Sequence, residues 1–431
     1  MAIDTPKTYR NLVMYSIFVR NYSKTGNFEG VRRDLDRIKA LGADIIWLLP
    51  IHPIGKKERK GALGSPYAIS DYRMVNPEFG TIDDLKKLVD DIHKHDMKCI
   101  IDVVYNHTSP DSWLALHHPE WFYHKPDGSF GNKVGEWLDV IDLDYSNRDL
   151  WEYQIDTLKM WASIVDGFRC DVAPLIPLEF WQRARNEVAS VNPNCFWLSE
   201  SVEPVFTVAN RARGMVSLSD SEIFQAFDVS YEYDIFYRFK DYLKGKITLA
   251  QYVEDINRQE AMYPDNYTKL RFLENHDNAR AAFIIPDEKA LLVWTAFIYF
   301  QKGMTLLYAG QEKGVQHLPD LFNEDKVDWS SGKDYSKFLR RLSEIKKDAA
   351  FSDSSYEVRA LPGDVLIAVH SRGSKKYFGV FPVTGKASLI DIDLPNGLYE
   401  NLINGEQIEV HAGMMSVDGS AMIFDLSDKK E

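Results

Sequence analysis

The sequence predicts an α/β protein: a (β/α)8, or TIM, barrel with a small insertion after its third strand and a C-terminal antiparallel β-sandwich. Three observations carry this prediction. Short apolar runs alternate with helical patterns up to about residue 350. Four of these runs stop at charged or amide side chains, as expected where parallel strands open onto one polar face. From Tyr356 onward the helical patterns cease, and short alternating runs separated by turn residues follow.

Eight apolar segments are predicted as the barrel strands. They are residues 13–19, 44–49, a run ending near 104, runs ending at 171 and at 200, and residues 223–229, 270–273 and 305–308. The four that end in polar clusters read CIIDVVYNH, VDGFRCD, CFWLSE and KLRFLENHD. An unpaired buried charge costs several kcal/mol or more, so these ends are expected to meet in one site.

Helical patterns fill the segments between the strands. They cover residues 30–41, 81–93, 150–164, a stretch after Pro177, and residues 231–243, 249–259 and 288–300. Gly42 suits the C-cap of the first helix, and Thr81 suits the N-cap of the second. This alternation divides the chain into a barrel of residues 1–106 and 148–352, an inserted subdomain of residues 107–147 and a β-sandwich of residues 353–431.

Charge and composition limit the classes of molecule that the protein is expected to bind. A net charge of −13 and a pI near 5.4 argue against nucleic acid or an anionic membrane, whereas a neutral ligand is compatible. No apolar run is long enough to span a bilayer, and the start lacks the pattern of a signal peptide. Together with three cysteines, an odd number, this favours a cytoplasmic protein, although a removed leader would leave the same start. The oligomeric state stays open.

Paired carboxylates indicate the chemistry. Retaining cleavage of a glycosidic bond needs a carboxylate nucleophile and a carboxylic acid proton donor, roughly 5 Å apart. Asp171 and Glu200 end adjacent predicted strands and suit these roles. Arg169, two residues before Asp171, points to the same side and is expected to keep that carboxylate ionised. Glu200 follows an apolar run, so desolvation is expected to raise its pKa.

The motifs resemble those of the α-amylase family, the retaining enzymes of glycoside hydrolase family 13, and most closely its short cytoplasmic bacterial members. DVVYNH, GFRCDVA, the acid of WLSE, and FLENHD look like the four conserved regions in their usual order, and YAGQE and SPYAISDY look like two auxiliary regions. The resemblance covers essentially the whole chain.

The resemblance implies a role for each matching residue. Asp171 would be the nucleophile, Glu200 the general acid/base and Asp277 the third carboxylate, which grips hydroxyls of the distorted sugar. The substrate-binding residues would be Tyr67, which stacks on the sugar, His107 and His276, which hydrogen-bond it, and Arg169, which orients Asp171. Asp102 is expected to support Arg169 and to take no part in the reaction itself.

The resemblance also implies a substrate class. An open cleft at Ala68, where relatives that release single glucose units usually have Asp, favours cleavage of internal α-1,4 bonds in starch, glycogen or maltodextrins. Val172 keeps an α-1,6-active relative of the oligo-1,6-glucosidase type open, and transfer to another sugar, as in glucanotransferases, is a further alternative. A non-catalytic interaction module is the remotest reading, because all three carboxylates are present.

The chemistry needs no cofactor, but a structural calcium ion is an open alternative. Asn106 matches a position that often ligates calcium in relatives, and Asp139, Asp142 and Asp144 offer further oxygen ligands. The absence of the Lys-His pair after Asp171 puts both the metal and the contacts to the leaving group in doubt.

Overall fold

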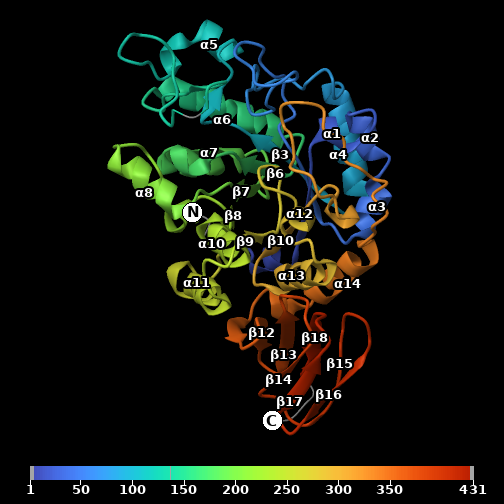
Figure 1. The fold of residues 1–431 in the computed structure, drawn as a ribbon. Coiled ribbons are helices and arrows are strands. Elements are labelled where there is room, and N and C mark those ends of the chain that lie inside the picture. Colours follow the sequence, from blue (N-terminus) through green and yellow to red (C-terminus); the bar gives the residue numbers. More distant parts are fainter. Residues whose placement is uncertain (1–3, 136, 428–431) are drawn as a thin grey trace.

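The computed structural model describes residues 4–135 and 137–427, and its core is a closed barrel of eight parallel strands (Figure 1). The outer limits of the predicted first and last domains, residues 1–3 and 428–431, lie outside this range. Around the barrel the order is β1-β10-β9-β8-β7-β6-β3-β2. The bounds are β1 Val13–Ile17, β2 Ile45–Leu48, β3 Lys98–Val103, β6 Gly167–Cys170, β7 Phe196–Ser199, β8 Val229–Tyr231, β9 Lys269–Arg271 and β10 Met304–Tyr308. The predicted (β/α)8 barrel is thereby confirmed.

Helices surround the barrel (Figure 1), and several bury one apolar face, as α4 does with Leu85, Leu88, Val89 and Ile92. A capping box of Thr81 and Asp84 starts that helix. The bounds are α1 Val19–Tyr22, α2 Phe28–Arg32, α3 Leu35–Ala40, α4 Ile82–Lys94, α6 Arg148–Ala162, α7 Leu178–Val188, α8 Pro204–Ala212, α9 Asp220–Ile223, α10 Tyr233–Leu243, α11 Leu249–Met262, α12 Ala281–Ile284, α13 Glu288–Phe300 and α14 Ser336–Lys346.

Three predicted elements differ from the structure. The predicted strand at 223–229 is wrong, because a capping box of Ser219 and Glu222 starts the short helix α9 there and β8 begins only at Val229. The predicted helix at 30–41 is divided into α2 and α3. The predicted first strand ends two residues early, and α1 begins at Val19.

The insertion after β3 is a small subdomain beside the barrel mouth, at the end of the molecule that carries α5 in Figure 1. Strands β4 (His107–Thr108) and β5 (Ile141–Asp142) pair antiparallel, and α5 (Trp113–His117) lies between them in sequence. The pairing sets His107 opposite Asp142. His107, the last residue of the CIIDVVYNH run that contains β3, therefore lies in a strand of the insertion.

The C-terminal part forms two antiparallel four-stranded sheets at the opposite end of the molecule (Figure 1). Their orders are β11-β12-β13-β18 and β14-β17-β16-β15. The bounds are β11 Ser355–Leu361, β12 Val365–Arg372, β13 Lys375–Pro382, β14 Ser388–Asp391, β15 Gly397–Glu400, β16 Gln407–His411, β17 Met414–Val417 and β18 Met422–Asp425. Val365, Phe378 and Met415 share an apolar core within this sandwich. The predicted C-terminal sandwich is confirmed.

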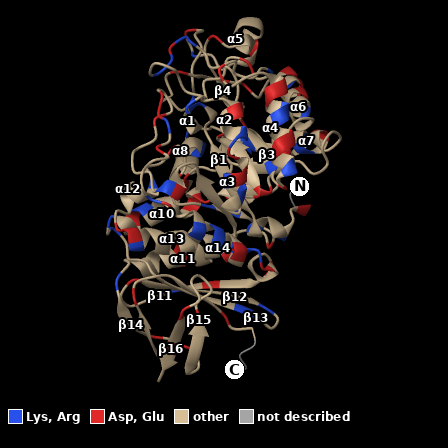
Figure 2. Cartoon of the chain, turned by 90° about the vertical axis from the view of Figure 1, so that its right-hand side faces the viewer, with Lys and Arg blue, Asp and Glu red and all other residues tan. Residues whose placement is uncertain are grey.

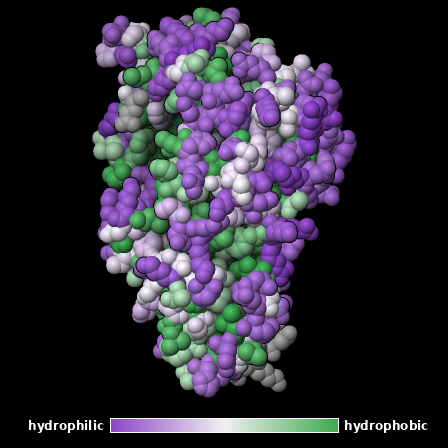
Figure 3. All heavy atoms as spheres, turned by 45° about the vertical axis from the view of Figure 1, so that its right-hand side comes forward, coloured by the Kyte–Doolittle hydropathy of each residue, from purple (hydrophilic) through white to green (hydrophobic). Residues whose placement is uncertain are grey.

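Charged side chains of both signs are interspersed on the outer helices, for example α4, α6 and α7 (Figure 2). Hydrophilic residues cover most of the face drawn in Figure 3, with hydrophobic patches scattered between them. Within the described part of the chain, every helix is too short or too polar to cross a bilayer.

Candidate active site

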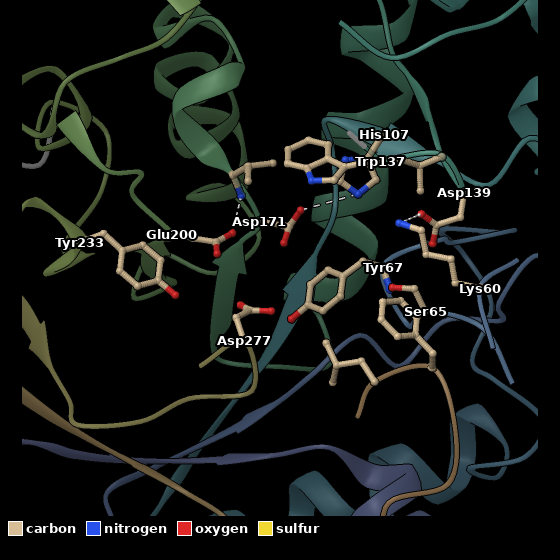
Figure 4. Close-up of a pocket in the computed structure, with 14 residues that line it drawn as sticks. Lys60, Ser65, Tyr67, His107, Trp137, Asp139, Asp171, Glu200, Tyr233 and Asp277 are labelled. Carbon is tan, nitrogen blue, oxygen red and sulfur yellow. Dashed lines mark hydrogen bonds and ion pairs between the residues drawn. The ribbon is translucent and has the colours of Figure 1, made fainter. Parts of the chain in front are cut away.

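The polar strand ends of the predicted site meet at one end of the barrel (Figure 4). Asp102 lies in β3 opposite Arg169 of the neighbouring β6, Asp171 follows β6 directly and Glu200 follows β7 directly. Asp277 lies in the loop after β9. Because these strands are parallel, their carboxyl ends open onto the same face, where side chains from different strands converge.

Arg169 is the centre of this cluster and is fully buried. Its Nη1 donates to Asp102 Oδ1 at 2.9 Å and to Asp171 Oδ1 at 2.7 Å. Its Nη2 forms an ion pair with Glu200 Oε2 at 3.0 Å. One guanidinium therefore fixes the two carboxylates expected to react, together with the supporting Asp102.

Burial shifts the pKa of both acids that are expected to react. It raises the pKa of Glu200 to about 8, and Arg169 opposes this shift. Burial also raises the pKa of Asp171, although Arg169 and a hydrogen bond from Glu200 lower it. The expected contact of Arg169 with Asp171 is present, but the net shift runs opposite to the expected one because desolvation outweighs it. Glu200 is the acid better suited to hold a proton.

The backbone N–H of Val172 points toward the Glu200 carboxyl group. Its φ of 35° and ψ of 42° place a β-branched residue in the left-handed region, which such residues rarely adopt. Its N–H donates to Glu200 Oε2 at 2.8 Å. Backbone strain of this kind persists where the surroundings over-determine it, and here it orients the candidate acid.

Asp277, His276 and Tyr67 form a second group on the cavity wall. His276 Nε2 lies 3.0 Å from Asp277 Oδ2 and 2.6 Å from the Tyr67 hydroxyl. Tyr67 also donates to Asp102 Oδ2 at 3.0 Å, and its ring stacks on His276 at a centroid distance of 5.5 Å. Burial raises the pKa of Asp277, but His276 more than offsets it, so the net shift is downward and Asp277 favours the carboxylate.

His107 reaches the cluster from the insertion. Its Nε2 lies 3.9 Å from Asp171 Oδ2, and its ring packs against Trp137 at 5.4 Å between centroids. Burial lowers the pKa of His107 to about 4, so the imidazole is neutral near pH 7. A neutral ring is able both to donate and to accept a hydrogen bond.

A cavity of about 310 Å³ opens over these residues (Figure 4). It is lined by Lys60, Ser65, Tyr67, His107, Trp137, Asp139, Val140, Asp171, Val172, Glu200, Tyr233, Asp277, Leu321 and Phe322. A second cavity of about 320 Å³ shares Trp137, Val172, Glu200, Tyr233 and Asp277 and continues past Glu203, Phe206 and Lys240. Glu200 and Asp277 therefore line both cavities, whereas Asp171 lines the first.

Every predicted catalytic and substrate-binding residue lies in this cluster or lines the first cavity. Some residues of the cavity walls were not predicted from the sequence, namely Lys60, Tyr233, Leu321 and Phe322, and Phe206 beyond Glu200. They come from loops and helix starts with no motif, so only the folded chain brings them to the site.

Known proteins resemble the chain over nearly its whole length. The family model described as the α-amylase catalytic domain matches residues 16–118 and 116–354, and the bacterial α-amylase C-terminal domain matches residues 357–424. The chain belongs to the α-amylase family.

Two solved structures show how close some α-amylase family members are. An α-amylase from Lactobacillus plantarum is 46% identical, with 97% of this chain and 99% of that chain covered and a TM-score of 0.95. A maltogenic α-amylase from Thermotoga neapolitana is 34% identical, with 96% and 98% covered and a TM-score of 0.86. The protein is thus an enzyme of this glycosidase family.

Curated relatives are more distant and differ in activity. α-Amylase 2 of Dictyoglomus thermophilum is 24% identical over 93% of this chain and 74% of its own length. An α-1,4-glucan:maltose-1-phosphate maltosyltransferase of Picrophilus torridus is 29% identical over 52% of this chain and 40% of its own length. Family membership alone therefore leaves hydrolysis and transfer to be distinguished.

The expected calcium ligands of this α-amylase family member do not fit a calcium site. The Asn106 amide nitrogen faces Asp142 Oδ1 at 3.5 Å, and Asp142 Oδ2 accepts the Lys133 N–H at 2.7 Å. Asp139 Oδ1 pairs with Lys60 Nζ at 2.9 Å. Across residues 4–135 and 137–427, no three His, Cys, Asp or Glu side chains gather as a metal site. Donor groups already face the oxygens that calcium would need.

Ala68 does not line the cleft of this α-amylase family member. It is buried, and its backbone carbonyl accepts the Gly55 N–H at 2.9 Å. Lys60, Asp139 and Phe322 are among the residues that do line the cavity.

Proposed function

We propose that the protein is a retaining hydrolase that cleaves internal α-1,4-glucosidic bonds of starch, glycogen or maltodextrins through a covalent glycosyl-enzyme intermediate. The observation that carries the proposal is that Asp171 and Glu200 are held by one guanidinium in one cavity, where burial raises the pKa of Glu200 to about 8. Retaining cleavage needs this pairing of a nucleophile with an acid.

Each proposed step follows from these positions. Asp171 attacks the anomeric carbon as Glu200 gives its proton to the leaving glycosidic oxygen, so one C–O bond forms as another breaks. The ionised Glu200 then takes a proton from water, whose oxygen displaces Asp171 from the anomeric carbon and restores both carboxyl groups. Asp277 and His107, which line the cavity, would hold hydroxyls of the reacting sugar, and the fully buried His276 would position Asp277 and Tyr67.

The two cavities support cleavage within a chain of sugars. The sugar attacked by Asp171 would lie on the side of Tyr67 and His107, and the leaving part would lie beyond Glu200 toward Phe206. Space on both sides suits a bond that has glucose units on either side of it. The name α-amylase borne by the Lactobacillus plantarum relative supports α-1,4-glucan as the substrate class.

Transfer to a second sugar is the other candidate. The space beyond Glu200 is partly walled by Trp137, Val172 and Phe206, which suit a sugar ring better than free water. The maltosyltransferase relative shows that the family includes such chemistry. Products longer than the starting oligosaccharide would favour transfer over hydrolysis.

The test uses a chromogenic maltooligosaccharide with Asp171→Asn and Glu200→Gln. We expect each variant to lose activity by about 10³-fold or more and to keep a native circular dichroism spectrum, because nucleophile and acid are removed without change of volume. Glu179→Gln, a change at an exposed helix position, should leave activity intact.

Proton NMR of the first product tests retention separately, and the α-anomer should form first. A β-anomer, or full activity in either amide variant, would contradict the proposal. A wild-type protein that releases no chromophore would favour the non-catalytic interaction module.

A further inference from the structure

Lys60 and Asp139 meet at the end of the cavity that lies farthest from Glu200 (Figure 4). Lys60 belongs to the loop after β2, and Asp139 belongs to the insertion. Their Nζ and Oδ1 atoms are 2.9 Å apart, and the ammonium lies 5.9 Å from the centre of the Phe322 ring. Three segments remote in sequence thus join where the sugar chain would leave the cavity.

The backbone that carries Lys60 is anchored. Leu63 N–H donates to the Phe322 carbonyl at 3.0 Å, and Ala62 N–H donates to Asn323 Oδ1 at 2.9 Å. Gly61 has a φ of +68°, and a Cβ there would lie 2.6 Å from both Cβ and O of Phe322. Only glycine allows this contact between the two loops. The backbone of this loop is therefore held in place, and the Lys60 side chain reaches from it to Asp139.

The pair itself is able to open. The Lys60 side chain is 40% exposed, whereas that of Asp139 is 6% exposed. Water competes for the exposed ammonium and salt screens the attraction, although opening the pair leaves the buried Asp139 carboxylate without this partner. Among the ion pairs of the described residues, Lys60 is the partner that Asp139 has. A sugar chain that extends past this end of the cavity would meet the pair, because both residues line the cavity there.

We infer that Lys60 and Asp139 form a latch that closes the donor end of the cleft, so that the enzyme prefers short maltooligosaccharides whose non-reducing end lies under the latch. This inference rests on the proposed function, because it assigns the donor side from the roles of Asp171 and Glu200. A closed latch fixes how many glucose units lie on the donor side. Internal bonds of polymers, and chains that extend past this point, are cleaved only when the latch opens, so the open state carries the internal cleavage proposed above.

Lys60→Met and Asp139→Asn test the latch, with amylose and maltoheptaose as substrates. We expect each variant to raise the ratio of kcat/KM on amylose to that on maltoheptaose by about threefold, the scale of a weak ion pair. Both should also broaden the lengths of the first products. Lys57→Met removes a charge from the exposed part of the same loop and should change neither quantity.

Salt provides a second readout that a purely structural role would not give. Raising sodium chloride from about 0.05 M to about 0.5 M should shift wild-type products in the direction of Lys60→Met and leave that variant unchanged. Unchanged substrate ratios and product lengths in both variants would overturn the latch alone. Absence of any hydrolysis by the wild-type protein would overturn the proposed function and the latch with it.

Discussion

At the scale of single residues, the site depends on groups that would be unfavourable elsewhere. A buried charge is tolerated only with partners, and Arg169 supplies them to Asp102, Asp171 and Glu200 at once. The same burial that makes Glu200 a usable acid makes its ionised form costly. The burial that favours the proposed acid role of Glu200 therefore lowers the stability of the fold when Glu200 is ionised.

The pH dependence of stability makes this effect measurable. The pKa of Glu200 is about 8 in the folded protein, above its ordinary 4.5. A raised pKa stabilises the fold fully below the ordinary value, and that contribution is lost as pH rises through about 8. Glu200→Gln cannot ionise, so its melting temperature should exceed that of the wild type by several degrees more at pH 9 than at pH 5.

Differential scanning fluorimetry at the two pH values checks this result, with Glu179→Gln as the matched surface change. In the wild type, kcat/KM should fall over the same alkaline range, because the proton for the leaving oxygen is lost. A difference in melting temperature that stays constant between pH 5 and pH 9 would contradict the assignment.

At the scale of elements, the spacing of β6 and β7 decides the site, because these neighbours carry Asp171 and Glu200. Gly167 begins β6 opposite Phe196 of β7. A Cβ on Gly167 would lie 2.2 Å from the Phe196 carbonyl oxygen and 2.8 Å from its nitrogen. Both atoms belong to the backbone, so the strands themselves would have to move apart.

Gly167→Ala should therefore impair stability and activity together. Overpacking of this kind costs about 1–3 kcal/mol, and a shift of about 1 Å between catalytic groups costs on the order of 10²-fold in rate. Urea unfolding and kcat/KM on a chromogenic maltooligosaccharide measure the two effects. Gly131→Ala is the matched control, since a Cβ there meets the flexible Lys125 side chain. Wild-type activity in Gly167→Ala would show that the strand spacing is not critical.

Elements with a strong local signal were predictable from the sequence, and those set by tertiary packing were not. Helix α13 has the predicted bounds, and α4 begins at its predicted Thr81 cap. The apolar run at 223–229 looked like a strand, but its Phe224 and Phe227 are buried outside any strand. The strand ends that meet in the candidate site were predictable for the same reason: charge beside an apolar run is a local signal. The sequence around Lys60 and Phe322 has no such local signal, so their place in the cavity wall was not predictable.

At the scale of the whole molecule, part of the sandwich packs into the core of the barrel, beside a second core that lies within the sandwich itself. Leu366, Ala368 and Phe381 of the sandwich belong to the same buried cluster as the barrel strands. The Phe381 ring lies 5.3 Å from that of Phe297 and 5.4 Å from that of Phe300, both on α13. Helix α13 is apolar on nearly all sides, since it packs against the barrel on one face and the sandwich on another.

Because of these shared contacts, we predict that the sandwich stabilises the barrel and thereby preserves the activity of the distant site. Phe381→Ala leaves a cavity between sandwich and α13, and a buried Phe to Ala change costs about 3–5 kcal/mol. Calorimetry should give a single unfolding transition, shifted to lower temperature, and activity should be lost at that same temperature. Leu389→Ala, at a sandwich position that is 65% exposed, should leave both temperatures unchanged. Two separate transitions, with activity surviving the first, would mean that the barrel is stable without the sandwich, and the apolar surface of α13 would then need another explanation.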